Sequence, residues 1–272
     1  MKKTVVLALA AVVILAAGVA VYLYRFQEST KPQQAQVEIA VPPELPAESP
    51  PVPRQVLEEP PEREALPSLT ESDQVILDAL VGLMGSERVM KLFYGTRLIN
   101  KFVAVVDNLP RKKLPVAVVP VRRAAGAFIV EGSQDAWIIS PPNAARYSGY
   151  VAFAEAVDAG RLADIYVRFY PLFQQAYEEM GYPGKYFNDR LLVAIDDLLS
   201  APLASKPVRL VRPGVFYPGV FYLYADPNLE ARSSGQKILM RIGVADAVKI
   251  KKKLDEIKKQ IQRRMRDKKA AD

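Results

Sequence analysis

The first twenty-five residues constrain this chain most, because an unbroken apolar run spans residues 5–24, shortly after Lys2 and Lys3. As a helix, a run of this length rises about 30 Å, which matches the hydrocarbon core of a bilayer. Tyr22 and Tyr24 near its end are typical of a membrane interface. The sequence therefore predicts a transmembrane signal-anchor helix over residues 1–25, and the rest of the chain is expected to work beside a membrane.

A cleaved secretory signal peptide is the alternative interpretation of this segment. Two lysines form a positive start, and Gly18-Val19-Ala20 offers small residues for a cleavage site. However, the apolar run is longer than the stretch of about 7 to 15 residues that signal peptides use, and it continues past Ala20. We therefore favour the uncleaved anchor.

The positive residues also predict an orientation. Lys2 and Lys3 on a very short N-terminal tail favour a cytoplasmic N-terminus, and Arg25 and Lys31 oppose this only weakly. In a bacterial cell, this arrangement gives a single-pass inner-membrane protein with a periplasmic C-terminal domain, held by residues 5–24.

The segment that follows the apolar run has a different composition. Ten of the chain's 22 prolines fall in residues 26–67, among Glu, Gln, Ala and Val. Such a segment cannot bury enough apolar surface to fold, and proline biases it toward an extended chain of about 3 Å per residue. We expect a disordered proline-rich linker that reaches on the order of 100 Å.

The remaining pattern predicts an α+β fold, a mostly helical single domain with a small antiparallel sheet over residues 68–243. Helical periodicity follows candidate N-caps at Thr70–Asp73, Ser86 and Thr96, and Pro110 is expected to end the third of these helices. Further helices are expected within residues 148–199, with Asn188 capping the last, and from Asp226-Pro227. The expected strands are 114–121, 128–131, 137–140, 208–211 and 221–224.

One local duplication stands out: Pro-Gly-Val-Phe-Tyr occurs at residues 213–217 and again at 218–222. An insertion of five residues would turn every later side chain to the other face of a strand, so we expect a bulge or loop to absorb it.

Residues 244–272 predict a basic amphipathic helix with an apolar stripe. Residues 245–272 hold eleven Lys or Arg and five Asp or Glu residues, so this end contributes +6 of the net charge of +7. Three interpretations stay open: a helix that packs its stripe on the domain, a self-associating helix, or a binder of anionic surfaces. No nucleic-acid fold motif accompanies the charge, so nucleic acid is disfavoured as a partner.

The chain contains no histidine and no cysteine. This composition excludes Ser-His-Asp triads, cysteine nucleophiles, imidazole acid/base catalysis and zinc sites built from these residues. No glycine-rich phosphate-binding motif occurs either. We therefore expect no metal and no cofactor, and any catalysis would depend on carboxylates and tyrosines.

The candidate site residues lie mostly in residues 170–190, which are dense in polar and aromatic side chains. Glu178 and Asp189 are the candidate acid/base carboxylates, although paired surface carboxylates are usually only solvated. The candidates for ligand binding or a polar network are Asp107, Asn108, Arg146, Tyr147, Tyr177, Tyr182 and Arg190. An aspartate at a helix C-terminus opposes the helix dipole, so we expect Asp107 to have a partner among Arg111, Arg146 and Arg190.

Several segments together resemble a bacterial family described as domain of unknown function 3014. The resemblance spans about Leu66 to the basic tail. It is carried by Val106–Arg111, Ala145-Arg146-Tyr147, Tyr170–Arg190, Ala225-Asp226-Pro227 and Gly235-Gln236-Lys237. It implies an anchor, a proline-rich tether and one domain, but no reaction and no catalytic residue. The duplicated Pro-Gly-Val-Phe-Tyr departs from the single copy that the family would have.

These observations favour a non-enzymatic, membrane-tethered envelope module that binds a protein or a cell-wall component such as peptidoglycan. A long spacer is useful only if the domain must reach a partner or stay clear of the bilayer. The alternative is a carboxylate-based envelope hydrolase or lyase that acts on glycan or peptide crosslinks. Convergence of the candidate residues on one site would favour the enzyme.

Overall fold

The structure is a computed structural model, and it describes residues 66–133, 137–204, 206–212 and 222–271. The helices are α2 (Ser72–Met84), α3 (Ser86–Leu92), α4 (Leu98–Asn108), α5 (Ser148–Glu155), α6 (Ala159–Glu179), α7 (Phe187–Leu199), α8 (Pro227–Glu230), α9 (Ser234–Arg241) and α10 (Val244–Ala271). Three short 3-10 segments are η1 (Leu69–Glu71), η2 (Val116–Val118) and η3 (Pro141–Tyr147). The predicted anchor and linker lie outside the described residues, as does the duplicated segment up to residue 221.

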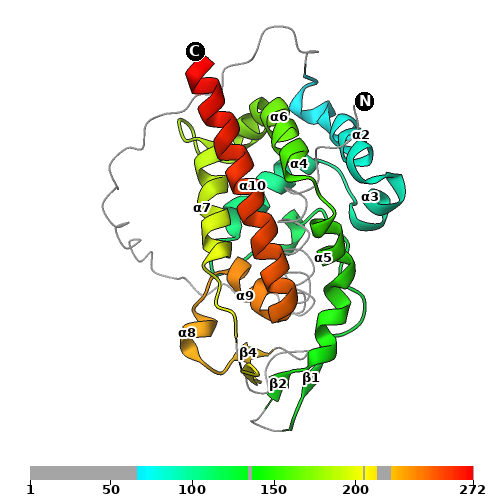
Figure 1. Cartoon of the computed structure of the whole chain (residues 1–272), viewed down its shortest axis with the longest axis vertical. Helices are drawn as coiled ribbons and strands as arrows, with labels where there is room; N and C mark the ends of the chain where they lie inside the picture. Colours follow the sequence, from blue (N-terminus) through cyan, green and yellow to red (C-terminus); the bar gives the residue numbers. More distant parts are fainter. Residues whose placement is uncertain (1–65, 134–136, 205, 213–221, 272) are drawn as a thin grey trace, which may run out of the picture.

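Four short strands form one antiparallel sheet in the order β1-β2-β3-β4. They are β1 (Val130–Glu131), β2 (Trp137–Ile139), β3 (Arg209–Val211) and β4 (Leu223–Tyr224). The described domain is therefore mostly helical with a small antiparallel sheet, as the sequence predicts. Figure 1 shows the sheet at one end of the helical body, and both the start of α2 and the C-terminal end of α10 lie toward the other end.

The main hydrophobic core lies among the helices, where α6 packs against α4 and α10. Phe102, Phe173 and Phe187 from three helices meet in its centre, with ring centroids 5.3 to 6.1 Å apart. A second, smaller cluster lies under the sheet and contains Phe128, Leu210, Tyr222, Tyr224 and Met240.

The basic helix α10 is part of the main core. Its stripe of Ala247, Ile250, Leu254, Ile257, Ile261 and Met265 is buried, and the helix packs on α5, α6 and α7 (Figure 1). Two of its lysines reach carbonyl groups just past neighbouring helix ends: Lys253 donates to Val157 O, 2.7 Å away, and Lys251 donates to Ala201 O. Of the three interpretations of this helix, the structure shows the packed one for the apolar stripe.

The expected strand at 114–121 is wrong. The chain there forms the 3-10 turn η2, and only Val121 makes an isolated bridge, with Phe93. Pro115 and Pro120 lack the N–H that a strand ladder needs, so the apolar run cannot hold a strand.

Three expected helix caps are also wrong. The N-cap of α3 is Gly85, and that of α4 is Arg97, which has a left-handed φ of 58°. The backbone N–H groups of Arg97 and Leu98 donate to the Asp73 carboxylate at 2.6 and 2.7 Å, so a side chain from α2 caps α4. Asn188 lies inside the first turn of α7, whose N-cap is Tyr186.

Among the residues that the structure describes, no helix has both the length and the apolar composition needed to cross a membrane.

Candidate functional site

Asp107 is the centre of the candidate site. It lies in the last turn of α4, and only 4% of its surface is exposed. Pro110 follows it and prevents the helix from continuing. A buried carboxylate beside the negative end of a helix is unfavourable unless cations compensate it.

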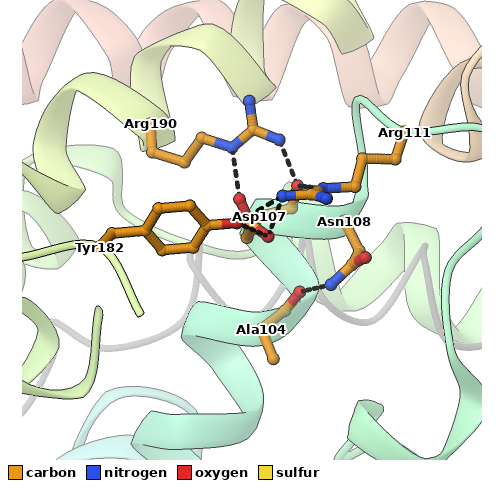
Figure 2. Close-up of polar contacts among 6 residues, drawn as sticks. All are labelled: Ala104, Asp107, Asn108, Arg111, Tyr182 and Arg190. Atoms are coloured by element: carbon orange, nitrogen blue, oxygen red, sulfur yellow. Dashed lines mark hydrogen bonds and ion pairs between the residues drawn. The ribbon is translucent and has the colours of Figure 1, made fainter. Parts of the chain in front are cut away.

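Two arginines provide this compensation (Figure 2). Arg111 Nη2 lies 2.8 Å from Asp107 Oδ2, and Arg190 Nε lies 2.9 Å from Oδ1. Both guanidinium groups also donate to the backbone carbonyl of Asp107. Of the three arginines expected as partners of Asp107, Arg111 and Arg190 are therefore confirmed. Because Arg190 comes from α7, the cluster joins the end of α4 to that helix.

Tyr182 completes the cluster from the loop between α6 and α7. Its hydroxyl accepts a hydrogen bond from Arg111 Nη2 at 2.6 Å and donates to Asp107 Oδ2 at 3.3 Å (Figure 2). The ring of Tyr182 stacks on Tyr177, with centroids 4.6 Å apart. Burial and the nearby Asp107 carboxylate raise the pKa of Tyr177, so its hydroxyl stays protonated at neutral pH.

Gln174 holds the loop between α6 and α7 in place. Its side-chain oxygen accepts hydrogen bonds from the Phe187 N–H at 2.9 Å and from the Tyr170 hydroxyl at 3.1 Å. Its amide nitrogen donates to Lys185 O and to the Glu178 carboxylate. One side chain on α6 thus fixes the entry into α7, which in turn places Arg190.

The candidate catalytic carboxylates, Glu178 and Asp189, are both exposed. Although Asp189 is exposed, neighbouring protein atoms partly desolvate its carboxyl and raise its pKa above the ordinary value. Burial also raises the pKa of the Tyr170 hydroxyl, and both carboxylates contribute to that shift. A raised pKa keeps the Tyr170 hydroxyl protonated near neutral pH and makes it a poor proton donor to a substrate, and this hydroxyl already donates a hydrogen bond to Gln174.

Asn108 and Asn188 have structural positions. The amide nitrogen of Asn108 donates to Ala104 O at 2.8 Å, within its own helix (Figure 2). The side chain of Asn188 is buried, and its oxygen accepts from the Tyr166 hydroxyl at 3.2 Å.

Arg146 and Tyr147 belong to a second polar group, at the end of the domain that carries the sheet. Arg146 donates to the carbonyl groups of Ala125 and Gly126 at 2.9 and 2.8 Å, and to Asn143 Oδ1 at 3.0 Å. Burial raises the pKa of the Tyr147 hydroxyl. The structure therefore separates these two residues from Asp107, and Arg146 is not the partner of that carboxylate.

Among the described residues, no group of three or more carboxylates gathers closely enough to hold a metal ion.

A sequence model of a family described as "Protein of unknown function (DUF3014)" matches residues 98–258, from the start of α4 well into α10. The match covers more than half of the chain. The chain belongs to the DUF3014 family. No curated protein and no solved structure matches it.

The DUF3014 match includes a third polar group that sequence reasoning missed. Asp197 on α7 accepts hydrogen bonds from Ser233 Oγ at 2.6 Å and from Gln236 Nε2 at 2.9 Å. Burial raises the pKa of this carboxyl, although its hydrogen bonds and nearby arginines oppose the shift. Ser233 also caps α9, because its hydroxyl accepts from the Gln236 N–H. The pattern Ser-Ser-Gly-Gln is a readable N-cap signal for that helix.

The neighbouring motif residues in this DUF3014 chain also have structural roles. A Cβ added at Gly235 would lie 2.6 Å from Leu198 Cδ2 and 3.3 Å from Leu109 O, so a larger residue there would require the Leu198 side chain or the Leu109 backbone to shift. Lys237 pairs with Glu230 at 2.9 Å. The Gly-Gln-Lys segment thus holds α9 against α4 and α7.

Proposed function

We propose that this DUF3014 protein is a non-enzymatic binding module of the bacterial envelope, tethered to the inner membrane by its N-terminal segment. The observation that carries the proposal is the state of the candidate site. Both oxygens of the Asp107 carboxylate already accept hydrogen bonds from arginines of the same chain. A carboxylate engaged in this way holds helices together and is poorly placed to act on a substrate.

The start of the described chain and the sheet lie at opposite ends of the domain, and this arrangement supports a role away from the membrane. The described chain begins near α2, toward the end of the domain opposite the sheet (Figure 1). A tether that enters at that end would be attached at the end of the domain opposite the sheet. This geometry suits a domain that meets a partner at a distance from the bilayer.

The enzymatic alternative has less support. Glu178 and Asp189 both lie near Tyr170, and this arrangement favours the enzymatic alternative. Yet Glu178 is engaged by Gln174, and Tyr170 has a raised pKa and donates to the same glutamine. A carboxylate-based hydrolase would need one of these groups to exchange protons near neutral pH.

The topology is tested by protease protection in spheroplasts. With a periplasmic domain, external protease digests the protein without lysis of the inner membrane, because nothing shields the domain. Digestion that requires lysis of the inner membrane would place the domain in the cytoplasm and overturn the proposed orientation.

The binding role is tested by crosslinking in cells followed by mass spectrometry of the captured material. We expect specific capture of an envelope protein or a peptidoglycan fragment. Glu178→Gln with Asp189→Asn should capture the same partner, because binding does not depend on these carboxylates. Accumulation of uncleaved glycan or peptide crosslinks in cells that carry this double variant would favour the enzyme instead.

A further inference from the structure

A cationic surface lies where the loop between α3 and α4 meets the segment that follows η2. The two stretches run side by side, because the Arg122 N–H donates to Leu92 O at 2.7 Å and the Tyr94 N–H donates to Pro120 O at 3.1 Å. The Arg122 guanidinium carbon lies 6.0 Å from the ring centroid of Tyr94, which is 44% exposed. The surface therefore carries an accessible aromatic ring with a cation beside it.

Three more cations adjoin this ring in the chain. Lys101, in the first turn of α4, reaches back over the loop, since a Cβ added at Gly95 would lie 2.8 Å from its Nζ. Arg97, at the end of the loop, and Arg123, next to Arg122, are both exposed. Together these residues form what we call the Tyr94 surface: Tyr94, Arg97, Lys101, Arg122 and Arg123.

The positive charge of the Tyr94 surface is not neutralised within the described part of the chain. None of its four cations forms an ion pair with another described residue. Asp73 lies beside Arg97, but its two carboxylate oxygens accept the backbone N–H groups of Arg97 and Leu98. The surface therefore favours an anionic occupant.

A segment of opposite charge joins the domain close to this surface. Residues 58–64 are Glu-Glu-Pro-Pro-Glu-Arg-Glu, with four glutamates and one arginine, so their net charge is −3. They end two residues before Leu66, where the described chain begins, and Leu66 lies seven residues before Asp73. Since the Asp73 carboxylate binds the Arg97 N–H at 2.6 Å, the acidic segment enters the domain near the cations.

The acidic segment can reach the surface and can occupy it with weak contacts. The eight residues from Glu58 to Leu66 span at most about 28 Å. Figure 1 shows the start of the described chain near α2, against which α3 packs. A short covalent link gives an effective concentration in the millimolar range, so a contact that is only millimolar between separate molecules is populated here. Exposed ion pairs, each of which contributes little, are therefore sufficient together.

We propose that the Tyr94 surface is the docking site of the acidic proline-rich segment 58–64 of the same chain. The glutamates balance most of the positive charge, and Pro60 and Pro61 pack on the Tyr94 ring, because aromatic surfaces are what proline-rich peptides bind. Docking fixes where the tether leaves the domain and covers the cations against other anions. The inference goes beyond the proposed binding function and does not depend on it.

Disulfide crosslinking tests this contact, because the chain contains no cysteine and an introduced pair is unique. Thr96→Cys places one thiol on the exposed loop of the Tyr94 surface, and Pro60→Cys places the other in the acidic segment. The full-length protein is held in phosphatidylcholine nanodiscs, and the rate of disulfide formation under mild oxidation is measured. We expect a crosslink within the chain that forms about tenfold faster in 0.1 M than in 1 M salt, because salt screens the attraction.

Neutral variants of the surface show whether its cations hold the segment. Lys101→Gln with Arg122→Gln should slow the crosslink about fivefold or more in 0.1 M salt, because two of the four cations are lost. Lys112→Gln with Lys113→Gln is the matched control, since these exposed lysines follow the other end of α4 and should leave the rate unchanged. Melting temperatures of both variants show that the domain is folded.

Neutral variants of the tether give a second test that leaves the sequence of the described domain intact. Substitution of all four glutamates by glutamine, at positions 58, 59, 62 and 64, should slow the crosslink at least as much as the surface variant. The control carries glutamine at Glu38, Glu44 and Glu48, which are acidic residues of the same linker outside the proposed segment. It should crosslink like the parent protein.

Three results would overturn the proposal. Equal rates in the two surface variants would show that the cations do not hold the segment. Disulfides that form between chains would make a second copy of the protein the occupant of the surface. A crosslink that is lost when phosphatidylglycerol is included in the nanodiscs would make the anionic bilayer the occupant.

Discussion

Asp107 lies at the C-terminal end of α4, where the helix dipole disfavours a carboxylate. Neighbouring polar side chains stabilise its charge there. Two guanidinium groups and one tyrosine hydroxyl reach it from α4, α7 and the loop before α7. Since Asp107 is buried, loss of its charge would leave Arg190, with only 21% of its side chain exposed, without its ion-pair partner. The cluster therefore stabilises the junction of α4 with α7.

Asp107→Asn should lower the free energy of unfolding by about 3 kcal/mol, because it breaks a buried ion pair and leaves the arginines unpaired. Urea denaturation followed by circular dichroism measures this change. Asp189→Asn is the control, since Asp189 is exposed, and it should shift stability by about 0.5 kcal/mol or less. An unchanged stability in Asp107→Asn together with lost partner capture would mark Asp107 as a ligand-binding residue.

Asp197 predicts a pH dependence. Burial raises its pKa, so the folded protein holds this proton more tightly than the unfolded chain. Its contribution to stability is present below the unfolded pKa of about 3.9 and is lost as pH rises through the folded pKa. The stability of Asp197→Asn relative to the wild type should therefore increase with pH over that window, in urea denaturation at a series of pH values. A relative stability that falls with pH would contradict this.

Some residues of the polar groups could be predicted from the sequence and others could not, for physical reasons. The dipole argument requires a cation for Asp107, and it predicted a partner among Arg111, Arg146 and Arg190. It could not exclude Arg146, because only the fold separates that residue from α4. Asp197 was missed because its partners Ser233 and Gln236 lie 36 and 39 residues further along the chain, and nothing local shows that the fold brings them to α7.

At the scale of elements, α10 combines a buried apolar stripe with charged side chains that contact neighbouring helices. Its apolar stripe is buried, and its charged side chains contact the elements on either side: Lys258 pairs with Asp196 of α7, and Arg264 pairs with Asp164 of α6 at 2.5 Å. Much of the charge that suggested an anionic partner therefore serves contacts within the domain.

Ile257→Ala should destabilise the protein by about 2 to 5 kcal/mol, because Ile257 is 1% exposed and its loss leaves a cavity. Val248→Ala is the matched control on the same helix, since Val248 is 47% exposed and should change stability by about 0.5 kcal/mol or less. Thermal melts of the two variants measure these changes in stability. Equal effects would mean that α10 does not pack as described.

Gly235→Ala should cost about 1 to 3 kcal/mol, because the added methyl group would push α9 away from Leu198 and from the Leu109 carbonyl. Gly149→Ala is the control: nothing lies within 4 Å of its added Cβ, and alanine favours the helix α5. That variant should be neutral or slightly stabilising in chemical denaturation. A tolerated Gly235→Ala would contradict the close approach of α9.

Elements with strong periodicity were predictable, and those governed by tertiary contacts were not. The span of α4 follows from its apolar spacing and from Pro110. Its first turn is capped by Asp73, twenty-five residues before Leu98, and no local signal could indicate this. The segment 114–121 shows the opposite error, because β-propensity was given more weight than two prolines.

At the scale of the molecule, the folding unit is larger than the family match. Residues 98–258 exclude α2, whose Ile76 and Leu80 are buried in the main core. They also exclude Ile261 and Met265 of α10, which are buried in the same core. These contacts make both flanks part of the domain.

A fragment of residues 66–272 should therefore unfold in one cooperative transition, whereas residues 98–258 alone should show none, since two parts of the core are missing. Circular dichroism melts of the two fragments test this. A cooperative transition of the shorter fragment at the same temperature would show that the flanking elements are dispensable.

The burial of α10 also sets the timing of folding during synthesis. The ribosome releases a chain from its N-terminus, and domains generally fold as units. Because α5, α6 and α7 share a core with residues as late as Met265, the domain cannot close until this helix has emerged from the exit tunnel. The main core can therefore be completed only after most of the chain has been synthesised.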